Sequence, residues 1–287
     1  MDFHHPLFES LALPLVLSFA ATGLLRAVLG AVHGRRWASA GVAPAILVAS
    51  AWVIGWQMWP GELTEELPWI YASAALLGVG LEGMRAMKRT TWLACCVLWA
   101  LVLVGLSDQP AVLQVATWVV GAAAIAAVLG APLEQADAPA SLLVAGIGLS
   151  AVAFISGSPL LFELGLAIAA AIAGCALWLW PRVRIGFGAC GAVVCVIAWL
   201  TLAQGLALLT PVRPEVLLLL ACALTAGPTV QWLRRGRRPA IDAVIVAGLA
   251  ALWVAGAVAL ALHGEAEAVR QTPDPPHSTP PRLADKP

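Results

Sequence analysis

The sequence predicts an all-α integral membrane protein, a polytopic helical bundle of about ten transmembrane spans. The first observation is composition: 61% of the 287 residues are hydrophobic, only 11% are charged, and the mean hydropathy is +0.90. Soluble domains carry about 25% charged residues, so these few charges could not cover a water-exposed surface. The second observation is that apolar stretches long enough to cross a bilayer, about 20 residues each, recur along the chain. The composition also excludes a disordered protein and a disulfide-stabilised scaffold.

Ten apolar stretches fill residues 1–262, the predicted membrane domain. Backbone polar groups inside lipid must be hydrogen-bonded within their own segment, so each stretch is expected to be a helix. The predicted spans are 9–33, 41–59, 68–87, 91–107, 111–130, 138–156, 159–180, 186–208, 213–232 and 240–262. Residues that break helices are expected in the turns between these spans. They are Gly61, Pro68, Pro110, Pro132, Pro139, Pro159, Pro181, Pro211 and Pro239.

The two ends of the chain differ from the spans. No Lys or Arg precedes the first apolar run, so the basic start of a signal peptide is missing and the first span is expected to remain in the protein. Residues 263–287 are rich in proline and carry scattered charge, which predicts a disordered or extended tail. A solvated end is the simpler interpretation of this tail, and contact with a protein partner is the alternative.

Basic residues gather in alternate turns and so orient the chain, because Lys and Arg in short loops favour the cytoplasmic side. Eleven of the sixteen Lys and Arg residues fall on one side: Arg35, Arg36, Arg85, Lys88, Arg89, Arg182, Arg184, Arg234, Arg235, Arg237 and Arg238. Both termini are therefore expected outside the cytoplasm, in a bacterial inner membrane. The net charge of zero gives no reason to expect binding to nucleic acid.

The thirteen tryptophans admit two interpretations. Most of them flank turns, as Trp56, Trp59 and Trp69 do around the loop at 60–67, which is typical of anchors at the membrane interface. The alternative is a cage for a cofactor or ligand. Trp99 and Trp199 follow basic turns by 10 and 15 residues, a spacing that fits either a degenerate repeat or the abundance of Trp alone.

Small residues are dense within the spans and predict close helix packing. The pair Gly30 and Gly34 has small-xxx-small spacing, which favours packing and, less specifically, a dimer. The six cysteines all fall within spans without a CxxC motif, so they are expected to be apolar packing residues. Two adjacent histidines, His4 and His5, have poor geometry for a metal site, and no cofactor is expected.

A charged residue inside the membrane is costly and is a functional hypothesis by default. Arg26 lies in the first span, roughly 10 Å from its inner end, and Glu82 lies near the inner end of the third. They are predicted to form an intramembrane ion pair. The alternative is that Arg26 extends to the interface and Glu82 pairs with Arg85 three residues later.

Four polar residues share a depth near the outer ends of their spans, and they are the predicted substrate-binding residues: Glu163, Gln114, Gln204 and Glu215. Together they could line a polar vestibule that opens to the outside. The alternative is that they are interfacial residues that reach water. Glu163 is the best single candidate, because apolar residues flank it on both sides.

Two function classes remain. A small permease or carrier is favoured, and a neutral or apolar solute suits it because no Asp, Glu, His or Lys lies near the middle of a span. The alternative is a non-transporting scaffold, assembly factor or accessory subunit of a membrane complex. An embedded enzyme ranks behind both, because known catalytic motifs are missing from the sequence. The length and span count are similar to those of the drug/metabolite transporter superfamily. Its residue motifs are missing here, and its members usually have cytoplasmic termini, so no site is transferred.

Overall fold

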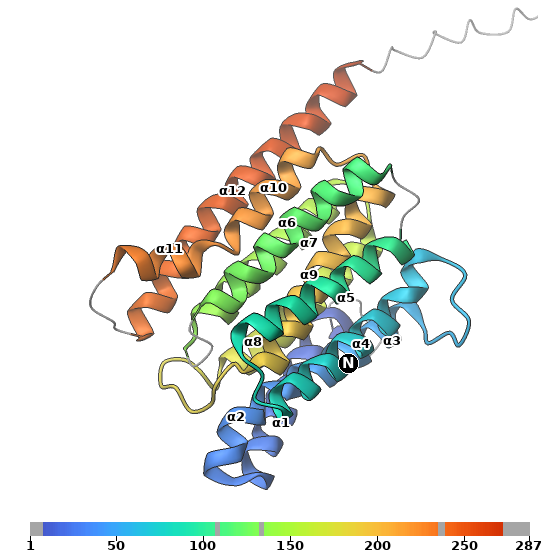
Figure 1. Cartoon of the computed structure of the whole chain (residues 1–287). Coiled ribbons are helices and arrows are strands. Elements are labelled where there is room, and N and C mark those ends of the chain that lie inside the picture. The colour runs from blue at the N-terminus through green and yellow to red at the C-terminus, as the bar shows by residue number, and fades with distance from the viewer. Residues whose placement is uncertain (1–7, 107–109, 132–134, 235–238, 272–287) are drawn as a thin grey trace, which may run out of the picture.

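The computed structural model of the chain describes residues 8–106, 110–131, 135–234 and 239–271. The described part of the chain is 84% helical and contains no strand. The predicted all-α fold class is therefore confirmed. Figure 1 shows the long helices running side by side as one bundle.

The long helices follow one another in the order of the predicted spans. They are α1 (Leu13–Val28), α3 (Val42–Ile54), α4 (Leu63–Gly83), α5 (Lys88–Leu106), α6 (Ala111–Gly130), α7 (Asp137–Ile155), α8 (Pro159–Ala176), α9 (Ala189–Leu209), α10 (Pro214–Ala223), α11 (Ala226–Leu233) and α12 (Pro239–Gln271). Four short helical turns complete the first hairpin: η1 (Phe8–Ala12), η2 (Gly30–Gly34), α2 (Arg35–Trp37) and η3 (Ala38–Gly41).

Eight helical segments in the described residues are long and apolar enough to cross a membrane, and a ninth span results if α10 and α11 are counted as one. The remaining predicted span corresponds to α4, which is helical but carries Glu65, Glu66 and Glu82. The chain is an integral membrane protein, since helices of this length and apolarity cannot all be buried within a single globule.

Helix α4 begins earlier than the sequence interpretation placed it. The turn expected at Pro68 lies inside the helix, which starts at Leu63 after the N-cap residue Glu62. The Glu65 carboxylate accepts hydrogen bonds from the backbone N–H groups of Gly61, at 2.8 Å, and Glu62, at 3.3 Å. This cap stabilises the first turn, so the helix continues through Pro68 despite the N–H that proline lacks.

Two other boundaries differ from the predicted spans. The span predicted at 213–232 is two helices, α10 and α11, which meet at an angle of 46° around Leu224 and Thr225. Helix α12 continues beyond residue 262 to Gln271, into the segment expected to be an extended tail, because the residues after 262 include the helix formers Glu and Ala. The rest of that tail, residues 272–287, lies outside the described residues.

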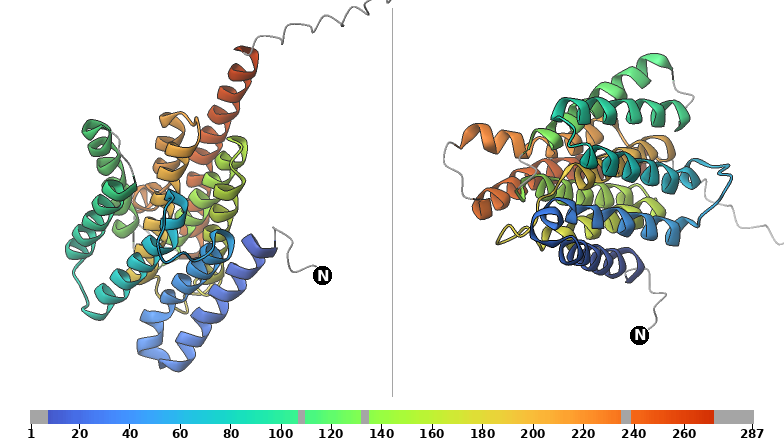
Figure 2. Two further views of the ribbon diagram at one scale, coloured as in Figure 1. Left: turned by 90° about the vertical axis from the view of Figure 1, so that its right-hand side faces the viewer. Right: turned by 60° about the horizontal axis from the view of Figure 1, so that its bottom comes forward.

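Helix α9 is the centre of the bundle, and it packs against α3, α4, α5, α6, α7 and α8. The α5–α6 hairpin stands to one side of the other helices, as the left view of Figure 2 shows. Two indole hydrogen bonds hold this hairpin together: Trp92 Nε1 donates to the Ala122 carbonyl and Trp118 Nε1 donates to the Cys96 carbonyl, both at 3.1 Å.

The basic and acidic turns lie at opposite ends of the bundle. In Figure 1 the turns at 30–41 and 177–188 lie at the lower left, the acidic loop at 55–62 lies at the right, and the end of α12 lies at the upper right. We call the end of the bundle that holds the turns at 30–41 and 177–188 the basic end, and the opposite end the acidic end. This arrangement agrees with the alternation expected from the positive-inside rule.

The close approach of α1 and α8 depends on a glycine. A Cβ atom at Gly174 would lie 2.4 Å from the Leu15 carbonyl oxygen and 3.0 Å from the Phe19 backbone nitrogen. We expect Gly174→Ala to lower the free energy of unfolding in detergent by about 1–3 kcal/mol, because rigid backbone atoms must move apart. Gly80→Ala on α4 is the matched control, since nothing lies within 4 Å of a Cβ there. Equal effects of the two substitutions would show that the α1–α8 contact does not require glycine.

Candidate functional site

A cavity of about 470 Å³ lies between the α5–α6 hairpin and helices α9 and α10. Its wall is mostly apolar and contains two indole rings and one amide. The residues on which its chemistry depends are Trp99 of α5, Thr117 and Gly121 of α6, and Trp199 and Gln204 of α9. A cavity of this size and lining is typical of a small-molecule site, which is concave and mostly apolar with few polar groups.

Gly121 lets the Trp99 indole lie against α6. A Cβ atom at this position would lie 2.1 Å from Trp99 Nε1 and 2.7 Å from Trp99 Cδ1, closer than any side chain allows. Trp99 is only 1% exposed and Gly121 is also buried. The absence of a side chain at residue 121 therefore fixes the position of one wall of the cavity.

Three residues that line this cavity each carry a buried N–H donor with no hydrogen-bond partner among the described residues. The donors are Trp99 Nε1, Trp199 Nε1 and Gln204 Nε2, and the side chains that carry them are 1%, 2% and 5% exposed. Buried polar groups in folded proteins are nearly always satisfied, because an unsatisfied one costs about 1–3 kcal/mol. Because three residues that line one cavity carry such groups, the cavity is a candidate site for a ligand, or for water, that supplies acceptor oxygens.

The cavity extends from the middle of the bundle toward its acidic end. Trp199 is close to the midpoint of α9, about 15 Å from either end of that helix. The opposite part of the wall includes Val212 and Pro214, in the turn that joins α9 to α10 and at the start of α10. A solute in this cavity would therefore reach the depth at which many transporters bind their substrates.

The structure brings only one of the four predicted substrate-binding residues to this cavity. Gln204 lines it, and Gln114, Glu163 and Glu215 do not. The cavity is lined by Leu113 and Pro214, which directly precede Gln114 and Glu215 in sequence. Gln114 and Glu215 therefore lie beside the cavity wall. Glu163 is half-buried on α8, and α8 contributes nothing to the lining.

Trp99 and Trp199 are the site residues that sequence reasoning missed. Most of the other tryptophans flank turns, where an anchoring role accounts for them. Trp99 and Trp199 instead lie far from the ends of α5 and α9, at a depth where an indole N–H has no water to bond. Their mid-span position is the signal that could have identified them.

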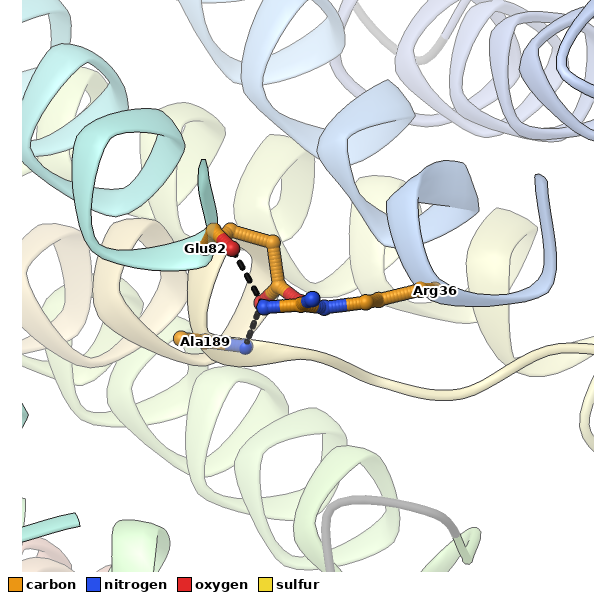
Figure 3. A network of polar contacts seen from close by, with 3 residues as sticks. All are labelled: Arg36, Glu82 and Ala189. Carbon is orange, nitrogen blue, oxygen red and sulfur yellow. Dashed lines mark hydrogen bonds and ion pairs between the residues drawn. The ribbon is translucent and has the colours of Figure 1, made fainter. Parts of the chain in front are cut away.

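The expected ion pair between Arg26 and Glu82 is replaced by another pair. Arg36, in the short helix α2, donates from Nε to the Glu82 carboxylate and from Nη2 to the Glu82 backbone carbonyl. The second carboxylate oxygen accepts the Ala189 backbone N–H at 2.7 Å, as Figure 3 shows. The alternative local pair with Arg85 is not formed either, because the carboxylate faces α2 and the start of α9.

The Glu82 contacts join three segments that are distant in sequence: the first hairpin, the end of α4 and the beginning of α9. Glu82 is 5% exposed, and its charge is balanced by Arg36 and by the positive end of the α9 helix dipole. Arg26 lies elsewhere, and its Nη1 atom is buried with no hydrogen-bond partner in the described part of the chain. The hydrogen bonds and ion pair around Glu82 therefore hold these three segments together.

Two features thus occupy opposite ends of the bundle: the mostly apolar cavity toward the acidic end and the Glu82 network at the basic end. The cavity has the shape and lining to hold a molecule within the membrane domain, which makes it the candidate functional site. Comparison with models of known protein families and with curated proteins finds no match for this chain.

Proposed function

We propose that this integral membrane protein is a small permease that binds a neutral solute in the cavity between α5, α6, α9 and α10. The observation that carries the proposal is that Trp99, Trp199 and Gln204, which line one mostly apolar cavity, each carry an unpartnered N–H donor. A charged solute would need an opposite charge in the cavity, and the lining residues carry none.

The chemistry of the wall defines the solute class. The indole N–H groups donate hydrogen bonds and accept none, and the free Gln204 Nε2 is also a donor. The solute is therefore a neutral molecule with an apolar body and at least one acceptor oxygen, such as a carbonyl, amide or ether. The proposed location is a bacterial inner membrane, with the basic turns on the cytoplasmic side.

The experiment is photolabelling with benzophenone, which is neutral and apolar and has one carbonyl acceptor. Membranes that contain the full chain are irradiated with the probe, and the labelled peptides are mapped by mass spectrometry. The proposal predicts label on the segments of α5, α6 and α9 that line the cavity. Label spread evenly over lipid-facing helices would leave the scaffold or accessory-subunit alternative as the better account.

Gln204→Leu keeps the approximate volume of the side chain and removes its donor. We expect about tenfold weaker labelling of the cavity, because the probe loses one hydrogen bond in a mostly apolar site. Gln231→Leu is the matched control, since Gln231 also has a buried, unpartnered Nε2 but lies on α11, outside this cavity. A similar loss in both variants would contradict a role for Gln204 in binding.

Transport is measured separately in proteoliposomes by stopped-flow light scattering, with acetamide as a small neutral solute that carries a carbonyl acceptor. The permease proposal predicts faster equilibration than in empty vesicles, and slower equilibration for Gln204→Leu. Benzophenone labelling of the cavity without any flux would indicate a binding protein that does not transport.

A further inference from the structure

A second cavity, of about 530 Å³, lies at the basic end of the bundle. Its wall is formed by the first hairpin, the end of α4, the start of α5 and the segment that leads into α9. Four cationic side chains line it: Arg35, Arg36, Arg85 and Lys88. They come from two turns that are distant in sequence, at residues 35–36 and 85–88, and the fold brings these turns to one cavity.

Among the described residues, the positive charge of this cavity is only partly balanced. Its lining contains one carboxylate, Glu82, and that carboxylate pairs with Arg36. Within the ranges that the structure describes, Arg35, Arg85 and Lys88 form no ion pair. The beginning of α9 also lines the cavity and adds the positive end of a helix dipole. Counted over the described part of the chain, the cavity therefore has three cations without a counter-charge, which would attract an anion.

Arg85 occupies a backbone position that favours glycine. Its φ angle is +52°, and it stands just after the end of α4. The Ala86 N–H donates to the Leu81 carbonyl at 3.0 Å and the Arg85 N–H donates to the Glu82 carbonyl at 3.2 Å, which is the hydrogen-bond pattern of a Schellman cap. Glycine would form this turn with less strain, so capping does not account for an arginine here.

The rest of the cavity wall is apolar and points to an amphipathic anion. Val32, which is 81% exposed, and Leu129 line the cavity together with the cations. Met84 and Met87, next to Arg85 and Lys88 in sequence, are 73% and 71% exposed. Exposed apolar side chains beside cations are suited to the boundary between headgroups and acyl chains, and basic pockets between helices on the cytoplasmic side bind anionic headgroups.

We propose that this basic cavity is a binding site for the phosphate of an anionic phospholipid from the cytoplasmic leaflet. The phosphate lies between Arg35, Arg85 and Lys88, and the glycerol and upper acyl carbons contact the apolar wall. The site is separate from the solute cavity and does not depend on its function. A soluble phosphate compound has the same charged group but lacks the apolar part that the wall would contact.

The test is native mass spectrometry of the full chain in detergent. The protein is incubated with equal amounts of dioleoylphosphatidylglycerol and dioleoylphosphatidylcholine, and the bound lipids are counted. We expect preferential retention of phosphatidylglycerol. Inorganic phosphate, added at an ionic strength matched with sodium chloride, should not displace it.

Three variants make the test specific. Arg85→Gly relieves the strained turn and removes one cation, and Lys88→Gln removes another, so each should weaken phosphatidylglycerol binding about fivefold. Arg89→Gln is the matched control with the same change of charge, because Arg89 is exposed and does not line the cavity. A thermal midpoint of Arg85→Gly at or above that of the unmodified chain shows that any loss of lipid is not caused by unfolding.

Several results would overturn the assignment. Equal retention of the two lipids, or an equal loss in Arg89→Gln, would show that the cavity does not select the anion. Displacement of the lipid by inorganic phosphate at matched ionic strength would assign the site to a soluble phosphate compound instead.

Discussion

Glu82→Leu is expected to lower the free energy of unfolding by about 1–3 kcal/mol, less than for a fully buried ion pair because the Arg36 side chain is 34% exposed. The substitution leaves the Arg36 guanidinium and the Ala189 N–H without the carboxylate that both contact. It also releases the link between the first hairpin, α4 and α9. The measurement is unfolding of the full chain in detergent, followed by circular dichroism.

Three further variants separate the ion pair from general damage. Glu82→Gln keeps an acceptor for the Ala189 N–H and should cost less than Glu82→Leu. Arg36→Met combined with Glu82→Leu should recover part of the loss, because the double variant leaves no unpaired charge. Glu163→Leu, a half-buried carboxylate without this network, should have little effect on stability. An equal loss of unfolding free energy in Glu82→Leu and Glu163→Leu would contradict the proposed structural role of Glu82.

Gly121→Ala is expected to abolish benzophenone labelling of the solute cavity. The new Cβ atom would overlap the Trp99 indole, which must then rotate away from α6. Trp99 is packed against the core on its other sides, so the cavity is the space into which the ring can move. The displaced ring removes one donor and fills part of the volume that a solute would occupy.

Gly130→Ala provides the control on the same helix, because nothing lies within 4 Å of a Cβ at that position. It should leave labelling unchanged and slightly stabilise the protein, since alanine favours a helix over glycine by about 0.5–1 kcal/mol. If Gly121→Ala retained the label at the level of Gly130→Ala, Trp99 would not form a wall of the binding site.

Hydropathy predicted the helices because it depends on each segment alone. A stretch such as 111–130 is apolar throughout and can satisfy its backbone only as a helix, and α6 has those bounds. The errors arose where a local signal competes with a tertiary or capping contact. Pro68 suggested a turn, but the Glu62–Glu65 cap starts α4 before it.

Contacts between distant segments could not be predicted from the sequence. The sequence predicted Arg26 as the partner of Glu82, with Arg85 as the local alternative. In the folded protein Arg36 is the partner of Glu82, because α2 brings the Arg36 guanidinium to the end of α4. The solute cavity is similar: Gln204 was predicted from its depth, whereas its grouping with Trp99 and Trp199 depends on how α5 packs against α9.

The central claim is that a solute-accessible cavity enters the bundle from its acidic end, and cysteine accessibility tests it most directly. Thr117→Cys places a thiol on the cavity wall, and Val119→Cys, two residues later on α6, places one on a surface that is 53% exposed and outside the cavity. A membrane-impermeant maleimide is applied to intact cells, and labelling is read for each peptide, so that the native cysteines do not interfere. The account predicts labelling at residue 117 and none at residue 119. Equal labelling of both positions, or labelling of neither, would contradict it.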